Sequence, residues 1–207
     1  MLHTAILYIF NKAYVKLLAI HNRGIVGFIY KGSSRIYVAI MCEEIETCRL
    51  QLRHFTSNDA DDLYRIYSQP DLFKYMSNDK PLLWEQTREV INCLTENWQK
   101  HQFGVWAVVY KQHHELIGHC GFKFLENTKE IQIGYILLKS YWNMGLGTEA
   151  AKASLEYGFE RAKLERIVAV AKPENIASRR VMEKVGMKYE KDAYYYNNEV
   201  VYYSIMR

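Results

Sequence analysis

Apolar residues alternate with polar ones in some segments of the chain and recur every three to four residues in others. In Arg49–Phe55, Leu50 and Leu52 fall on one face, which predicts a half-buried strand. The wider spacing is typical of amphipathic helices. It predicts helices at about Asn58–Tyr67, Leu83–Lys100, Thr148–Ala162 and Ser178–Val185. Ser57 or Asn58 is expected to cap the first of them.

β-branched and aromatic residues mark a second class of segment, separated by short polar links. The predicted strands are Val105–Tyr110, Leu116–Phe124, Glu130–Leu138, Arg166–Ala171, Tyr189–Tyr196 and Val200–Met206. The first three resemble an antiparallel meander, and the last two a hairpin across Asn197 and Asn198. The pattern therefore predicts a mixed α/β (α+β) fold, with a central, mostly antiparallel mixed sheet and helices on both faces.

The first forty residues lie outside this pattern. His3–Ile20 is apolar and aromatic, but one asparagine and two lysines interrupt it, so we expect no membrane span. It also lacks the basic start, unbroken apolar run and cleavage site of a signal peptide. An amphipathic appendage and an extension translated upstream of the natural start both stay open. We expect an N-terminal extension of residues 1–44 and one domain of residues 45–207.

Composition excludes some classes of function. The 27 Lys and Arg against 23 Asp and Glu give a net charge of +4 without a long basic block, which disfavours nucleic-acid binding. The four cysteines lack CxxC spacing and are too few for a disulfide scaffold, which favours a reducing cytoplasm. His113 and His114 have no evident third ligand, so no metal site is expected.

Asn143–Thr148 contains two glycines where a predicted strand has ended and a helix begins. The first turn of a helix presents unpaired N–H groups and a partial positive charge, so it can bind a pyrophosphate if no Cβ blocks the approach. Gly145 and Gly147 remove that obstacle, although a tight turn that requires positive φ is an open alternative. A dinucleotide site is disfavoured, because the third glycine is missing and Ala171-Lys172 replaces the acidic residue expected after the next strand.

Three motifs follow one another along the chain. They are GYILL at Gly134–Leu138, YWNMGLGTEA at Tyr141–Ala150 and NIASRRVMEKVGM at Asn175–Met187. Together they resemble the GNAT superfamily of acyl-CoA-dependent N-acetyltransferases, and within it the ribosomal-protein N-terminal (alanine or serine) acetyltransferases. Thr47–Arg53 is similar to the first strand of that branch, so the resemblance covers about residues 45–207. The first forty residues stay outside it, which makes Met41 a plausible start.

The resemblance implies that acetyl-CoA is the co-substrate. Its pyrophosphate is expected on the backbone amides of Met144, Gly145, Leu146, Gly147 and Thr148. The strand Glu130–Leu138 is expected to diverge from Arg166–Ala171 at the acetyl-CoA site. The pantetheine arm would then pair with the free backbone of Ile136 and Leu138.

The resemblance also indicates groups at the thioester. A backbone N–H near Leu137 or Leu138 would polarise the carbonyl, and Asn175 and Ser178 would line this end of the site. In much of the superfamily, a tyrosine is the proposed acid that protonates the leaving thiolate. The residue at the matching position of this chain is Met182, which cannot donate a proton. Ser178 is therefore the candidate donor, and the alternative is that Ser178 only caps its helix.

The base is less evident. Gln132 stands where related proteins often carry a glutamate, and an amide cannot accept the proton. Glu130 lies two residues earlier on the same strand face and could act through a water, or could be a solvated strand-end carboxylate. Glu149 fits the family pattern, and we expect it to stabilise the first turn of its helix.

A weak base suits an acceptor that is already neutral. With a pKa near 7.7–8.0, roughly a quarter of an α-amine is neutral at cellular pH, against about one lysine in a thousand at ~10.4. The predicted activity is acetyl transfer to a primary amine, with a protein N-terminus as the first candidate acceptor. A polyamine, an amino sugar or an amino-acid derivative are alternative acceptors, and a non-catalytic acyl-CoA-binding module is an alternative function. A monomer or a homodimer is expected, with no membrane partner.

Overall fold

The computed structural model describes residues 15–20, 25–31, 36–40, 44–75 and 83–207, and contacts divide the chain into two units, Met1–Glu43 and Glu44–Arg207. In the first unit, three strands pair antiparallel in the order β1 (Val15–Ile20), β2 (Ile25–Lys31) and β3 (Ile36–Ile40). Most of His3–Ile20, and Met41, lie outside the described residues. Within the described segments, no helix combines the length and the apolar character needed to cross a bilayer.

The second unit contains an eight-stranded sheet in the order β10-β11-β9-β8-β7-β6-β5-β4. The strands are β4 (Ile45–Glu46), β5 (Leu50–Arg53), β6 (Val105–Tyr110), β7 (Glu115–Phe124), β8 (Ile131–Leu137), β9 (Arg166–Ala171), β10 (Lys188–Tyr195) and β11 (Asn198–Met206). Neighbours pair antiparallel except β8 and β9, which are parallel. The predicted fold class is confirmed, and Leu50 and Leu52 are fully buried, as their alternation indicates.

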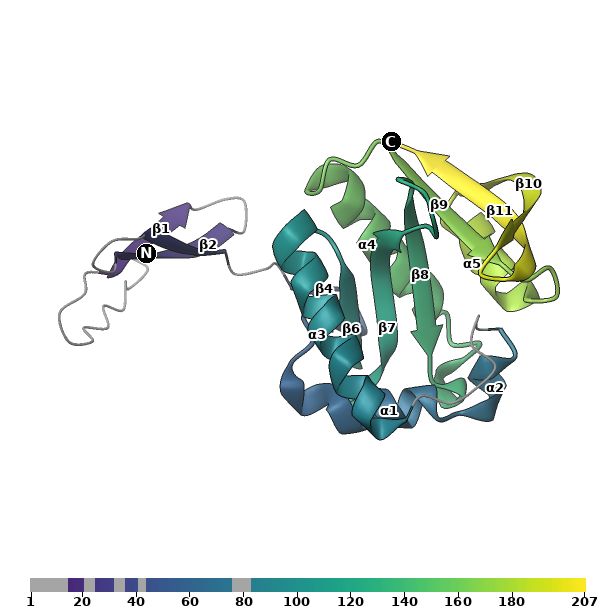
Figure 1. Cartoon of the computed structure of the whole chain (residues 1–207), viewed down its shortest axis with the longest axis horizontal. Coiled ribbons are helices and arrows are strands. Elements are labelled where there is room, and N and C mark those ends of the chain that lie inside the picture. Colours follow the sequence, from purple (N-terminus) through teal and green to yellow (C-terminus); the bar gives the residue numbers. More distant parts are fainter. Residues whose placement is uncertain (1–14, 21–24, 32–35, 41–43, 76–82) are drawn as a thin grey trace. The chain divides into compact units, whose positions relative to one another are not determined.

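Helices cover both faces of this sheet (Figure 1). They are α1 (Ala60–Tyr67), α2 (Pro70–Phe73), α3 (Trp84–His101), α4 (Leu146–Glu160) and α5 (Ile176–Lys184). Successive residues of a strand point to opposite faces. On β7, His119 contacts Tyr67 of α1, and the next residue, Cys120, contacts Ser154 of α4. Thus α1 and α4 lie on opposite sides of the sheet.

The start of α4 differs from the prediction. The helix begins at Leu146 and not at Thr148, because Gly145 takes a left-handed φ of 77° at the N-cap and lets the helix start at once. Gly147, which the sequence pattern assigns to a loop, therefore lies in the first turn of a helix. A left-handed φ explains why position 145 is a glycine, but it does not explain the glycine at position 147.

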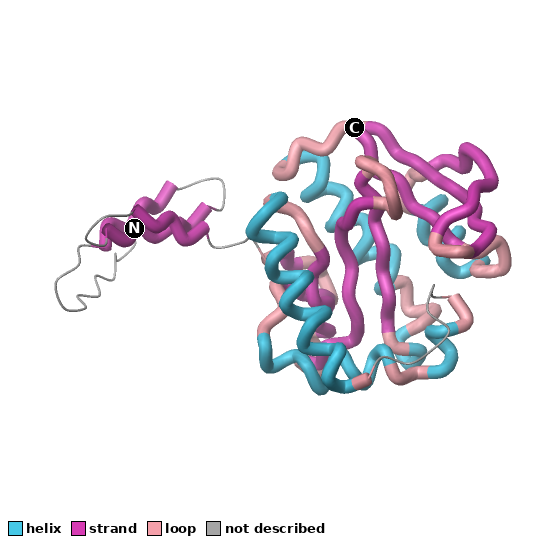
Figure 2. The backbone as a smooth tube through the Cα atoms, viewed as in Figure 1, coloured by secondary structure: helices cyan, strands magenta, loops and turns pink. Residues whose placement is uncertain are grey.

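The sheet opens between β8 and β9. These strands share a single register pair, Gln132 with Val168, whereas β7 and β8 stay paired from Phe124 and Ile131 to Gly118 and Leu137. Figure 2 shows the two strands close together at one end and spread apart at the other. In the described part of the chain, one edge of β8 beyond Gln132 thus has no neighbouring strand.

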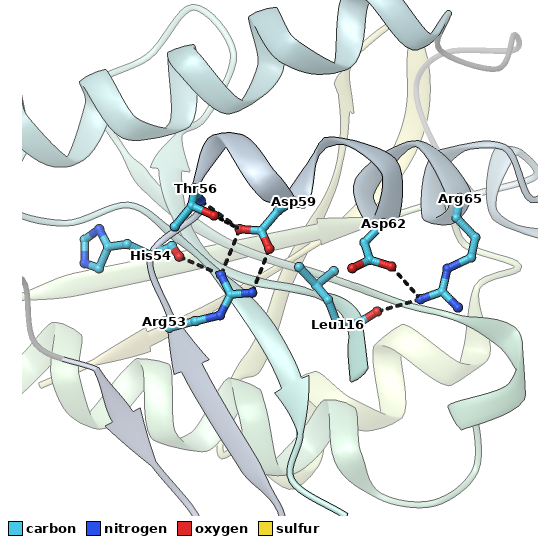
Figure 3. A network of polar contacts seen from close by, with 7 residues as sticks. All are labelled: Arg53, His54, Thr56, Asp59, Asp62, Arg65 and Leu116. Carbon is cyan, nitrogen blue, oxygen red and sulfur yellow. Dashed lines mark hydrogen bonds and ion pairs between the residues drawn. The ribbon is translucent and has the colours of Figure 1, made fainter. Parts of the chain in front are cut away.

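A partly buried ion pair attaches the strand β5 to the beginning of α1 (Figure 3). Arg53 donates to both carboxylate oxygens of Asp59, at 2.8 and 2.7 Å. The backbone N–H and hydroxyl of Thr56 donate to the same carboxylate, at 2.7 and 3.0 Å. The predicted caps, Ser57 and Asn58, instead belong to a short 3-10 turn, η1 (Ser57–Asp59), which precedes the helix.

Removal of the Asp59 charge is expected to destabilise the fold. Burial raises the pKa of Asp59, but the hydrogen bonds from Arg53 and Thr56 outweigh it and hold the pKa below its ordinary value of 3.8. Asp59→Asn should lower the free energy of unfolding by about 2–3 kcal/mol at pH 7, because it leaves Arg53 without its counter-ion. Because the folded pKa is depressed, this difference should persist above the ordinary value and shrink as pH falls through the folded pKa. Urea unfolding at several pH values measures it.

Asp62 provides the matched control. It pairs with Arg65 on the same helix at 3.1 Å, and both side chains are about half exposed (Figure 3). Asp62→Asn should therefore change the stability by less than about 1 kcal/mol. Equal losses for the two variants would contradict a structural role specific to Asp59.

Candidate active site

A tight turn leads from β8 into α4. Trp142 anchors this turn, because its indole N–H donates to the carbonyl oxygen of Leu137 at 2.8 Å. Asn143 and Gly145 take left-handed φ values of 61° and 77°, a conformation that asparagine tolerates and glycine adopts without strain. The turn geometry therefore accounts for the glycine at position 145.

Turn geometry does not account for Gly147. It has no left-handed φ, and among the described residues a Cβ built on it would meet only ordinary contacts, at 3.8 Å from Leu137 Cδ1 and 3.8 Å from Val181 Cγ2. Glycine loses more conformational freedom on folding than alanine, a cost that reaches about 0.5–1 kcal/mol in the middle of a helix. The chain thus keeps a costly residue where its own packing would accept a methyl group. The bare position is consistent with space that a bound molecule uses.

The backbone of the same turn presents hydrogen-bond donors. The first bond within α4 runs from Glu149 N to Gly145 O at 3.1 Å, so the N–H groups of Leu146, Gly147 and Thr148 precede the helical ladder. Such N–H groups have no acceptor inside their own helix, and the helix dipole adds positive potential. Met144 to Thr148, the predicted pyrophosphate site, form one continuous turn at this helix start.

A polar network that the sequence does not indicate holds this turn in place. Arg49 donates from Nε to Glu149 Oε2 at 2.7 Å and from Nη1 to the Met144 carbonyl oxygen at 2.8 Å. The hydroxyl of Thr47 and the backbone N–H of Arg49 donate to Glu149 Oε1, at 2.6 and 2.9 Å. Burial raises the pKa of Glu149, but these hydrogen bonds outweigh it and keep the pKa below its ordinary value. Glu149 therefore fastens the first turn to the β4–β5 loop.

The pantetheine arm is expected to pair with the backbone of Ile136 and Leu138, and some of these backbone groups face β7 instead of the open edge of β8. The N–H of Leu138 donates to Ile117 of β7 at 2.8 Å, and the Ile136 carbonyl lies against Gly118 of the same strand. Backbone groups of alternate residues face the same neighbour. The Leu138 N–H and the Ile136 carbonyl are therefore directed toward β7, and the Leu138 carbonyl accepts the N–H of Tyr141 at 2.9 Å. The pairing of pantetheine with the backbone of these two residues stays a prediction. The intervening Leu137 directs its N–H away from β7, toward the opening.

Ser178 lies in the first turn of α5 and does not cap it. Asn175 is the N-cap, and its Oδ1 accepts the N–H of Ser178 at 3.0 Å. The Tyr135 hydroxyl lies 3.0 Å from Ser178 Oγ and 2.9 Å from the Ser178 carbonyl oxygen, to which it can donate. Sequence reasoning missed Tyr135, although the first motif contains it. Met182 is 2% exposed and packs in the core.

The structure does not bring Glu130 together with Ser178. Glu130 Oε1 accepts the Tyr202 hydroxyl at 2.7 Å and lies 3.6 Å from Arg166 Nε. It precedes β8, whereas Leu137 ends this strand, a separation on the order of 20 Å. A base role for Glu130 remains a prediction.

The α1 side of the sheet carries a second group of candidate residues. Tyr67 Oη and His119 Nε2 lie 2.8 Å apart. Burial, and to a lesser extent the charge of Lys123, lowers the pKa of His119 to about 4, so the ring is neutral near pH 7. Gly134 lies on this face two residues before Ile136, the register partner of His119. A Cβ at Gly134 would meet no atom of the described residues within 4 Å, so these residues leave space beside the middle of β8.

Comparisons with known proteins agree with this geometry. The profile of the family described as Acetyltransferase (GNAT) domain matches residues 49–188. The Bacillus subtilis protein YkkB is 32% identical over 163 residues, which cover 77% of this chain and 94% of YkkB. A GNAT-family acetyltransferase structure from Bacillus anthracis has a TM-score of 0.68 and 32% identity, over 79% of this chain and 98% of that one.

A more distant structure shares the fold. RimL, a ribosomal L7/L12 α-N-protein acetyltransferase in complex with coenzyme A, has a TM-score of 0.70 and 19% identity, over 79% of this chain and 98% of RimL. The family profile spans more than half of this chain, and the match to YkkB covers 77% of this chain at 32% identity. The chain therefore belongs to the acetyltransferase (GNAT) domain family.

Proposed function

We propose that the protein transfers the acetyl group of acetyl-CoA to a primary amine, and that an α-amine of low pKa is the preferred acceptor. The observation that carries the first half of this proposal is Gly147. It leaves space at a helix start whose N–H groups have no partner within the helix, and protein packing does not require it to be glycine. A pyrophosphate fits both features.

Different residues of the chain would bind the pyrophosphate, hold the binding turn in place and polarise the thioester. The N–H groups of the turn Met144–Thr148 bind the pyrophosphate, and each hydrogen bond to a charged oxygen contributes about 1.5–3 kcal/mol. Arg49 and Glu149 keep this turn in position. The Leu137 N–H polarises the thioester carbonyl at the edge of β8, where charge develops on oxygen during attack.

The residues near the middle of β8 favour an acceptor amine that is uncharged when it binds. Gln132 is 5% exposed and cannot accept a proton, and burial keeps His119 uncharged. Next to the open space at Gly134, neither group offers the negative charge that would favour a cationic amine. A protein N-terminus, with its low pKa, suits this face better than a lysine side chain. Small amines such as a polyamine, an amino sugar or an amino-acid derivative remain the alternative acceptors.

Gly147→Glu is expected to move stability and affinity in opposite directions. The new Cβ makes ordinary contacts, at 3.8 Å from Leu137 and from Val181. The change should stabilise α4 by at most about 0.5–1 kcal/mol for the lost glycine and about 0.3–1 kcal/mol for acid at a helix start. The carboxylate also occupies the proposed pyrophosphate site, so the affinity for acetyl-CoA should fall at least about a hundredfold. Thermal unfolding and calorimetric titration measure the two effects.

Two variants complete this test. Gly147→Ala adds the Cβ without a charge, so it should weaken acetyl-CoA binding less than Gly147→Glu does. Lys152→Ala changes the net charge by the same single unit at an exposed position of the same helix, and should leave the affinity unchanged. Parent-like affinity in a folded Gly147→Glu variant would exclude this binding site.

Acceptor preference is expected to follow the neutral fraction of the amine. At pH 7.5, a peptide with a free N-terminus and dimethylated lysine should react at least about a hundredfold faster than an N-blocked peptide with a free lysine. Raising the pH should accelerate the lysine peptide about tenfold per unit and the α-amine peptide much less. Thiol release from acetyl-CoA measures both rates.

The same assay distinguishes the alternatives. Comparable rates for the two peptides at pH 7.5 would reject the α-amine preference, and faster turnover of small amines would identify them as acceptors. Tight acetyl-CoA binding without thiol release for any amine would indicate the non-catalytic acyl-CoA-binding module, which Met182 and Gln132 make conceivable.

A further inference from the structure

The strand β8 and the helix α5 approach each other at two successive levels of the opening between β8 and β9. At the first level, Leu137 and Val181 both border the space at Gly147, each 3.8 Å from a Cβ built there. At the second, Tyr135 contacts Ser178. Tyr135 lies two residues before Leu137, about 7 Å along the strand, and Ser178 lies about one helical turn before Val181. The Tyr135–Ser178 pair thus continues the path that starts at the glycine turn.

We propose that Tyr135 is a positioning residue that turns the Ser178 hydroxyl toward the leaving sulfur of the thioester. This inference rests on the proposed function, because it requires the thioester to lie in the opening. Neither the three motifs nor the family resemblance assigns a role to Tyr135. It would supply on β8 a phenol that α5 lacks at Met182.

The count of protons explains how the pair works. A phenol has one proton to donate, and two Ser178 oxygens lie within reach, the carbonyl at 2.9 Å and Oγ at 3.0 Å. When Tyr135 donates to Oγ, the Ser178 hydroxyl cannot donate back to it, so its own proton turns to another acceptor. The Asn175 side chain fixes the Ser178 backbone and leaves this rotation free.

Tyr135 keeps the proton that it donates. Burial raises the pKa of its hydroxyl well above the ordinary value of 10.0, so the phenol stays protonated throughout the working range. During transfer, the amine nitrogen forms the C–N bond and releases one proton to water. The C–S bond breaks with its electron pair on sulfur. Ser178 stabilises this thiolate with a hydrogen bond until the thiolate takes a proton from water.

The direct test is the ionisation of the coenzyme A thiol on the protein. Ultraviolet absorbance of the thiolate, titrated with pH, should show a lower thiol pKa for coenzyme A bound to the parent than for free coenzyme A. Tyr135→Phe and Ser178→Ala should each return the pKa toward the free value. In turnover, both should lower kcat about tenfold to a hundredfold with little change in KM for acetyl-CoA.

A double variant separates positioning from general support of the fold. If Tyr135 acts through Ser178, adding Tyr135→Phe to Ser178→Ala should cause little further loss of kcat. Tyr203→Phe is the matched control, because the Tyr203 hydroxyl also reaches α5, at 3.2 Å from Glu183 Oε1, without contact to Ser178. It should leave the thiol pKa and kcat unchanged.

The outcomes distinguish this inference from the function on which it rests. A parent chain that fails to bind coenzyme A would overturn both. Variants that bind coenzyme A with the parent's thiol pKa would overturn the role of Tyr135 alone. Additive losses in the double variant, or an equal loss in Tyr203→Phe, would assign Tyr135 to structure and reject the positioning role.

Discussion

The divergence of β8 from β9 is the constraint on which the other features of the site depend. A sheet edge inside a fold leaves backbone donors and acceptors without partners, which is costly unless water or a ligand satisfies them. Here the strands meet at Gln132 and Val168 and then separate, while β7 keeps the other edge of β8 fully paired. The opening is therefore rigid on one side, and the exposed edge has a fixed direction.

Main-chain groups form the proposed acetyl-CoA site, and side chains from distant segments hold those groups in place. Arg49 and Thr47 fasten the first turn of α4, and Asp59 fastens the first turn of α1. The first contact supports the proposed pyrophosphate turn, and the second supports the face on which His119 and Gly134 lie. Two ion pairs from one short stretch of chain thus organise both sides of the opening.

The sequence predicted the fold class, most strands and the glycine turn, because these depend on local periodicity and on residues next to each other in the chain. The edge of β8 that the Leu138 N–H faces was not predictable from the sequence, because the pairing of Leu138 with Ile117 of β7 decides it. Arg49 and Glu149 are 100 residues apart, and Tyr135 and Ser178 are 43 apart, so no local spacing indicates either contact. The early start of α4 was missed because glycine usually ends helices, whereas the left-handed Gly145 begins one.

Gly134 has a consequence for the way members of such a family diversify. Filling a bare position in a strand normally forces neighbours to shift, but here an added Cβ meets no atom within 4 Å in the part of the chain that the structure describes. Larger residues, especially β-branched ones, also suit a strand better than glycine. Single substitutions at this point can therefore narrow the space beside β8 at little cost in stability, and would change acceptor selectivity if the proposed acceptor binds there.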